Sequence, residues 1–118
     1  MHELAIADSI VTIVKEQAEK CNASHVTRVR LQIGEANAIV VDSLTFCFEM
    51  ITALEPVLTG AQLEIEGIPH RARCRHCEQE FAVVHFVAQC PTCETWDTEI
   101  ISGTEFRILD MEIEPIAR

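Results

Sequence analysis

Four of the six cysteines form two close pairs in the second half of the chain. Cys74/Cys77 and Cys90/Cys93 give the pattern C-x2-C-x12-C-x2-C within CRHCEQEFAVVHFVAQCPTC. A two-residue gap lets one tight turn hold two thiolates against a single ion, and the spacer is long enough for a hairpin that places the second pair opposite the first. We therefore predict a closed tetrahedral site of four thiolates. This is typical of structural zinc ribbons, and it leaves no open position for catalysis.

Two other interpretations of these pairs stay open at this point. Iron forms a rubredoxin-like site with the same four sulfurs, because geometry alone does not separate it from zinc. Two redox-active dithiols are the other alternative, although the strand-to-helix junction of a thioredoxin-like unit is missing. We favour zinc. Of the remaining cysteines, Cys47 is expected to be a small core residue, and Cys21 has no assigned role.

The chain begins with MHEL, in which a histidine directly follows the initiator methionine. Methionine removal requires a small second residue, so Met1 is expected to stay in front of His2. The free amine, the deprotonated His2 amide and the imidazole can then chelate one ion, and amide deprotonation favours square-planar Ni(II) or Cu(II). The alternative is an ordinary helix start, in which Glu3 is favoured by the helix dipole and His2 binds no metal.

Two helices are predicted around these sites. Residues 3–20 carry apolar side chains at three- and four-residue steps, which is the pattern of an amphipathic helix. A second helix is predicted at roughly 43–54, with Asp42 or Ser43 as its N-cap and Pro56 beyond its end. Its expected buried stripe comprises Leu44, Cys47, Phe48, Ile51 and Leu54.

Alternating polar and apolar residues predict half-buried strands over 28–33 and 61–66. A third strand is predicted over 105–114, where the alternation slips between Ile108 and Leu109 and so indicates a bulge or a twist. Two helices packed on a small three-stranded sheet give an α+β fold.

This α+β domain is predicted to comprise residues 1–69 plus 103–118. Residues 70–102 are then an inserted zinc-ribbon domain. An insertion of this length buries little apolar area, so the metal is expected to supply a large part of its folding free energy.

The composition excludes several classes of protein. Hydrophobic residues make up 48% of the 118 residues, enough for a packed core, yet no apolar run approaches the ~20 residues that span a bilayer. No signal-peptide pattern is present, so we expect a soluble, cytoplasmic protein. The net charge of −10 disfavours nucleic-acid binding. The sequence contains no recognisable nucleophile–base pair and no phosphate loop, so we predict that the protein is not an enzyme.

Together, the two metal motifs and the predicted elements make the sequence resemble the HypA/HybF family of hydrogenase maturation nickel chaperones. The residues that carry the resemblance are MHEL, VTRVRLQIGE, SLTFCFEM, CRHC, CPTC and ILDMEIE, in that order along the chain. The resemblance implies an α+β nickel-binding domain with a zinc ribbon inserted before the last strand. It also implies delivery of nickel to a hydrogenase large subunit together with a GTPase partner, and supply of urease in some organisms. A homodimer is left open.

The resemblance implies metal-binding roles for specific residues of this chain. His2 corresponds to the nickel ligand, together with the amine of Met1, and Glu3 is a supporting acidic residue. Zn(II) is the structural ion and Ni(II) the transient cargo. The zinc ligands implied are Cys74, Cys77, Cys90 and Cys93.

His85, on the spacer hairpin, is the leading candidate for a fourth nickel ligand, and some family members have a histidine there. A hairpin histidine that faces solvent is the alternative, and His70 and His76 are weaker candidates. The sequence departs from the family where glycines often follow the cysteine turns: Glu78 and Glu94 stand there, and they can strain the turns. The competing functions are a zinc-ribbon interaction module without nickel transfer and a rubredoxin-like electron carrier.

Overall fold

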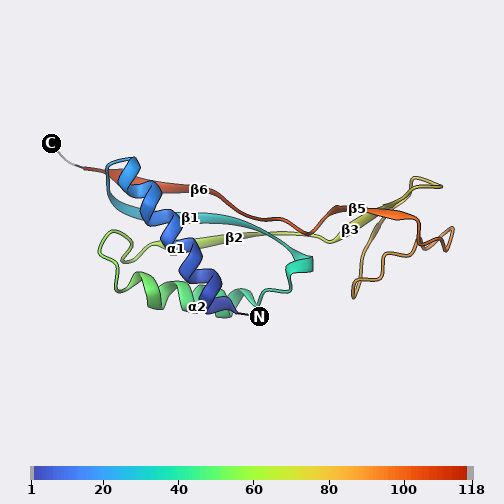
Figure 1. The fold of residues 1–118 in the computed structure, drawn as a ribbon, viewed down its shortest axis with the longest axis horizontal. Coiled ribbons are helices and arrows are strands. Elements are labelled where there is room, and N and C mark those ends of the chain that lie inside the picture. The colour runs from blue at the N-terminus through green and yellow to red at the C-terminus, as the bar shows by residue number, and fades with distance from the viewer. Residues whose placement is uncertain (1, 117–118) are drawn as a thin grey trace. The chain divides into compact units, whose positions relative to one another are not determined.

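The structure is a computed structural model that describes residues 2–116. Its elements are α1 (Glu3–Lys20), β1 (Ala23–Gly34), the 3-10 helix η1 (Glu35–Asn37), α2 (Val41–Thr52), β2 (Gln62–Ile68), β3 (Arg71–Cys74), β4 (Glu80–Ala82), β5 (Thr98–Ser102) and β6 (Phe106–Pro115) (Figure 1). The strands form two three-stranded sheets, in the orders β2-β1-β6 and β4-β3-β5. None of the helices among the described residues is long and apolar enough to cross a membrane.

The chain divides into two compact units. The first unit contains the residues up to Leu31, then Ile39–Glu66, and the residues from Arg107 onward. The second unit contains Gln32–Ala38 and Gly67–Phe106. The predicted α+β fold, with two helices and a small sheet in addition to the cysteine-containing segment, is confirmed.

The helix α1 spans the residues predicted from its apolar spacing. Leu4 and Ile13 are two of the apolar residues in this pattern, yet both are half-exposed. The reason is that α1 buries only a narrow face, in which side chains recur at three- and four-residue steps. That face comprises Glu3, Ala7, Ile10, Val11, Val14 and Ala18.

The predicted N-cap of the second helix is wrong. The residue that precedes α2 is Val40, and among residues 2–116 no side chain caps the helix. Asp42 lies inside the first turn instead. The backbone N–H of Val40 instead donates to Oε2 of Glu3 over 3.2 Å. A carboxylate from another helix thus holds the residue that precedes α2, and Asp42 and Ser43 lie within the helix.

The predicted end of the second helix is also too late. The helix α2 ends at Thr52, whose hydroxyl donates to the carbonyl of Phe48 over 2.8 Å. Leu54, which was predicted in the buried stripe, lies beyond the helix and is 83% exposed. Cys47 is half-buried rather than in the core. The buried residues of α2 are Leu44, Phe48 and Thr52.

The central strand β1 is longer than the predicted 28–33. Side chains add to the pairing near its start, because the hydroxyls of Ser24 and Thr27 donate to the carbonyls of Glu114 (3.0 Å) and Glu112 (3.3 Å) on β6. The apolar side chains that alternate along it, Val29, Leu31 and Ile33, are buried as predicted.

The two outer strands of the first sheet also extend beyond their predicted ends, to Ile68 in β2 and Pro115 in β6. In β6 the half-buried side chains are Ile108, Met111 and Ile113. Their spacing of three residues and then two confirms the predicted slip in the alternation.

In the second unit, β3 is the central strand and pairs antiparallel with β4 and β5. The predicted hairpin in the spacer is reduced to a tight turn, where Val84 and Val87 pair across His85 and Phe86. Both turn residues have left-handed φ values, 52° and 62°. The small core beneath this sheet comprises Ala72, Cys74, Phe81, Val83 and Cys90, with Ala88 packed against it.

Candidate metal centres

The two cysteine pairs form two turns with the same hydrogen bonds. In the first turn, the N–H of Cys77 donates to the sulfur of Cys74 over 3.4 Å, and the N–H of Glu78 donates to the Cys74 carbonyl over 3.0 Å. In the second, the N–H of Cys93 donates to the sulfur of Cys90 over 3.3 Å. Each turn therefore brings both of its sulfurs to one side.

The departure from glycine after each turn has a visible consequence. Glu78 and Glu94 adopt left-handed φ values of 63° and 59°. Glycine reaches this region without steric cost, whereas a residue with a Cβ does not. The strain anticipated from the sequence is therefore present in both turns, and all four cysteines still reach the site.

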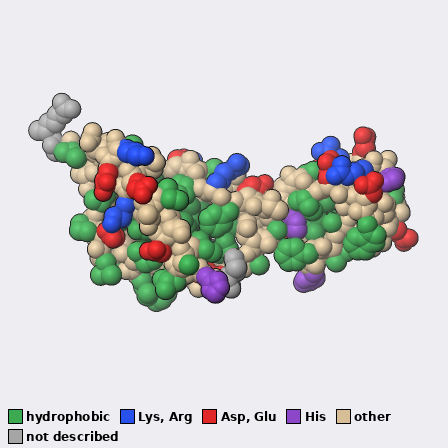
Figure 2. All heavy atoms as spheres, viewed as in Figure 1, with side chains coloured by type: hydrophobic (Ala, Val, Ile, Leu, Met, Phe, Trp, Pro, Cys, Tyr) green, Lys and Arg blue, Asp and Glu red, His purple; other side chains and the backbone are tan. Residues whose placement is uncertain are grey.

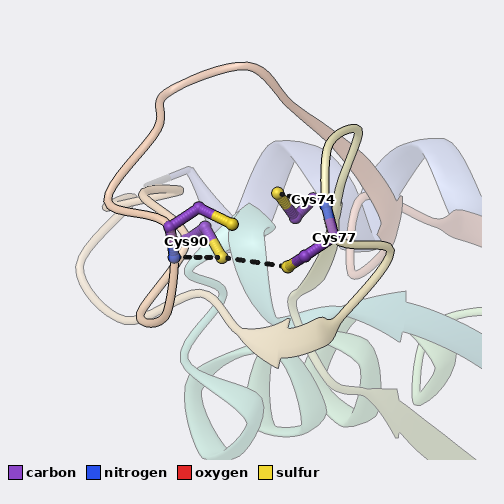
Figure 3. Close-up of side chains that lie close together, drawn as sticks. Cys74, Cys77 and Cys90 are labelled. Atoms are coloured by element: carbon purple, nitrogen blue, oxygen red, sulfur yellow. Dashed lines mark hydrogen bonds between the residues drawn. The ribbon is translucent and has the colours of Figure 1, made fainter.

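The four sulfurs converge on one point. They all lie within 4.8 Å of one another, and the Cys77 and Cys90 sulfurs are 3.7 Å apart (Figure 3). A tetrahedral site with metal–sulfur bonds of about 2.3 Å needs sulfurs about 3.8 Å apart. Cys74 and Cys90 are buried, while Cys77 and Cys93 are exposed. The donor set and its spacing thus fit a four-coordinate metal ion.

The acidities of the thiols differ within this cluster. The N–H of Cys77, which donates to the Cys74 sulfur, is the main cause that lowers the pKa of Cys74 to about 6. A hydrogen bond with the Cys77 side chain is the main cause that raises the pKa of Cys93 to about 12. Thiolates this close together repel one another, so a cation is needed before all four can be deprotonated.

Side chains outside the cysteines brace the two turns. Nε2 of His76 lies 3.0 Å from Oδ2 of Asp97, and Arg75 contacts the same carboxylate over 3.3 Å. Thr92, between the second pair, donates a short hydrogen bond to Gln79, which follows the first pair. His76 therefore has a partner in the second unit, which weakens it further as a nickel ligand.

The predicted nickel site is at the amino terminus, where the structure describes the residues from His2 onward. His2 is exposed and directly precedes the first helical residue of α1. Its carbonyl accepts the N–H of Ile6 over 3.0 Å. Met1, the predicted source of the amine ligand, lies outside the described residues.

Glu3 is buried, unlike most acids at a helix start. Its carboxylate accepts the N–H of Val40, and this hydrogen bond is the main cause that holds the pKa of Glu3 below its usual value. The link joins residues 37 positions apart. Sequence reasoning missed it, because no local pattern marks Val40 as a partner of Glu3.

The remaining histidine candidates lie in the second unit. His85 is exposed at the tight turn of the spacer. His70 is buried, and its ring lies edge-on to that of Phe86, with 5.8 Å between the ring centroids. His2 belongs to the first unit, so the assignment of His85 as a fourth nickel ligand stays a prediction.

The chain is similar to known proteins over nearly its whole length. A family model described as "Hydrogenase/urease nickel incorporation, metallochaperone, hypA" matches residues 1–113. A protein of Rippkaea orientalis described as hydrogenase maturation factor HypA is 46% identical over 116 residues, which cover 98% of both chains. A protein of Dehalococcoides mccartyi with the same description is 37% identical, over 97% of this chain and 95% of its own.

Solved structures agree with this similarity. The solution structure of the Ni metallochaperone HypA from Helicobacter pylori superposes with a TM-score of 0.69 and 26% identity, over 98% of this chain and all of that one. A second solution structure of a HypA protein gives a TM-score of 0.70 and 27% identity. This chain therefore belongs to the HypA family of nickel metallochaperones for hydrogenase and urease maturation.

Proposed function

We propose that this chain binds Ni(II) at its amino terminus and delivers it to the large subunit of a [NiFe]-hydrogenase, or to urease in some organisms. The position of His2, in a chain of this family, carries the proposal. Only the carbonyl of His2 enters the helix, where it accepts the N–H of Ile6. Among residues 2–116, no hydrogen bond engages the His2 imidazole or its amide nitrogen, so both are accessible to an ion.

The proposed nickel ligands are the imidazole and the deprotonated amide of His2 together with the amine of Met1. Three nitrogens of this kind favour a square-planar ion such as Ni(II). Glu3 supports the site by fixing the first turn of α1, since its buried carboxylate holds the N–H of Val40. His85 is the proposed fourth ligand. Nickel would leave by ligand exchange with the acceptor, without any bond-making chemistry on the protein.

For the cysteine cluster we propose a structural Zn(II). The close approach of four sulfurs on two braced turns supports a closed site, and a closed site suits a structural rather than a catalytic ion. Iron would use the same sulfurs, but it would give a coloured protein. The thiol chemistry of the site also supports a reducing compartment, and we propose the cytoplasm.

The proposed partners are the hydrogenase large subunit and a nickel-handling GTPase of the maturation system. The main competing function is a zinc-ribbon interaction module, which would bind zinc and a partner but no nickel. Both functions use the cysteine cluster, so only the amino terminus separates them.

The test is complementation of a strain that lacks this chain. The native chain should restore nickel-dependent hydrogenase activity at limiting nickel, and His2→Ala should not, although its zinc content stays the same. The matched control is His25→Ala, which removes a histidine of the first unit from β1. Full activity with His2→Ala would refute nickel delivery through the amino terminus and favour the interaction module.

A further inference from the structure

The helix α2 and the residues next to it carry large apolar side chains that no described residue of the first unit covers. Phe46 and Met50 lie four residues apart, so at 3.6 residues per turn they share one side of α2, and the exposed Leu54 follows just beyond the end of the helix. The buried side chains Leu44, Phe48 and Thr52 follow the same spacing two residues earlier, which places them on roughly the opposite side. Figure 2 shows hydrophobic side chains gathered along the edge of the first unit where Figure 1 places α2.

Two further exposed apolar side chains lie near the amino terminus, although Val40, four residues before Leu44, is not on the side of α2 that carries Phe46 and Met50. Leu4 and Val40 are both exposed, and the hydrogen bond from Val40 to Glu3 places the first turn of α1 beside the start of α2. We call the five exposed apolar residues Leu4, Val40, Phe46, Met50 and Leu54 the α2 row. Their exposed fractions range from 48% to 83%.

Acidic side chains border the α2 row. Asp8 follows Leu4 by about one turn of α1, Asp42 precedes Phe46 by about one turn of α2, and Glu49 directly precedes Met50. All three are exposed, and within residues 2–116 none of them forms an ion pair. The nearby base Lys15 is already paired with Glu55 over 3.0 Å. The surroundings of the α2 row are therefore negatively charged, which favours a positively charged binding partner.

We propose that the α2 row is the surface on which the nickel acceptor docks, and that the acceptor presents an apolar groove bordered by lysine or arginine. The inference rests on the proposed function. Ligand exchange requires the ligands of the acceptor to come within bonding distance of His2, so the docking surface must adjoin His2. Leu4 and Val40 of the α2 row lie beside the first turn of α1, and the acidic side chains near the row complement a basic rim.

A second copy of this chain is a poor occupant of the same surface. Each copy carries a net charge of −10 and the same acidic border. Face-to-face packing of two α2 rows would therefore bring like charges together, which disfavours association.

The test compares a double variant, Phe46→Ala with Met50→Ala, with the matched control Ile13→Ala. Alanine favours helix, so the backbone of α2 is preserved. Ile13 is as exposed as Met50 but lies on α1, outside the α2 row. The probe is the purified nickel-free hydrogenase large subunit, titrated by calorimetry with the nickel-loaded chain.

The double variant should bind the large subunit at least about 30-fold more weakly, because large apolar anchors dominate such interfaces. Ile13→Ala should bind like the native chain. All variants should keep the native affinity for Ni(II), and raising the ionic strength should weaken the binding of the native chain to the large subunit. Leu54→Ala is a second test, because this residue lies beyond the end of α2 and its removal cannot unfold the helix.

Unchanged binding of the large subunit by both the double variant and Leu54→Ala would overturn the proposal. So would a native dimer that the double variant converts to a monomer while large-subunit binding persists, because the α2 row would then serve self-association. Failure of the native chain to bind Ni(II) is a different result. It would refute the proposed function itself, and the separate nickel titration makes the two failures distinguishable.

Discussion

At the scale of single residues, Glu3 joins the first turn of α1 to the residue that precedes α2. Replacement by alanine removes the acceptor of the Val40 N–H, so we predict faster hydrogen exchange at the Val40 amide and a lower melting temperature. Glu16→Ala, at an exposed site on the same helix, should change neither. The measurement is amide exchange by NMR, and unchanged protection of Val40 would show that the Glu3 contact does not persist in solution.

Arg30 and Asp110 form a two-point ion pair across β1 and β6. The hydrogen bond from Arg30 is the main cause that lowers the pKa of Asp110 below 3.8. A lowered folded-state pKa means that this pair contributes stability above about pH 3.8 and loses it as the pH falls through the folded value. We predict that Arg30→Gln raises the pKa of Asp110 towards 3.8, measured by NMR titration of the carboxyl carbon. An unmoved pKa would mean that the pair does not hold in water.

At the scale of elements, Gly103 lies at the connection from β5 to β6, with φ of 101°. A Cβ there would lie 2.3 Å from the Cα of His70, so backbone would have to move. We predict that Gly103→Ala costs at least about 2 kcal/mol of unfolding free energy, because strain and clash add. Gly67→Ala meets nothing within 4 Å and is the control. Equal urea midpoints for the two variants would contradict this packing.

The helices and strands could be predicted wherever a periodic apolar pattern sets them, as in α1 and in the alternation of Val29, Leu31 and Ile33. The ends of these elements could not be predicted where a tertiary contact determines them. The N-cap of α2 was predicted wrongly because its hydrogen-bond partner is Glu3, on another helix. The turn at His85 and Phe86 carries neither glycine nor asparagine, so no local signal marked its position. The cysteine cluster was predictable, because each pair lies in one local turn and the spacer is long enough to bring the two turns together.

At the scale of the whole molecule, the two units are expected to have separate sources of stability. Trp96 is the only tryptophan and belongs to the second unit, whereas α1 and α2 belong to the first. We predict that a strong chelator, or Cys74→Ala, changes the Trp96 fluorescence while the far-UV helical signal persists, because the metal rather than a large core holds the second unit. Cys21→Ala, outside the cysteine cluster, should retain all of the zinc. Loss of the helical signal together with the zinc would contradict the predicted boundaries at residues 70–102.

The central claim is that the amino terminus, and not merely a histidine side chain, binds nickel. One glycine added before Met1 keeps every side chain but converts the Met1 nitrogen into an amide and moves the amine away from His2. Calorimetric titration of the tag-free native chain and the extended chain with Ni(II), at equal zinc content, therefore isolates the amine. We predict that the extension weakens nickel binding and alters the visible spectrum of the bound ion. Equal affinity and the same spectrum in both chains would contradict the claim, because an ordinary helix start tolerates an added residue.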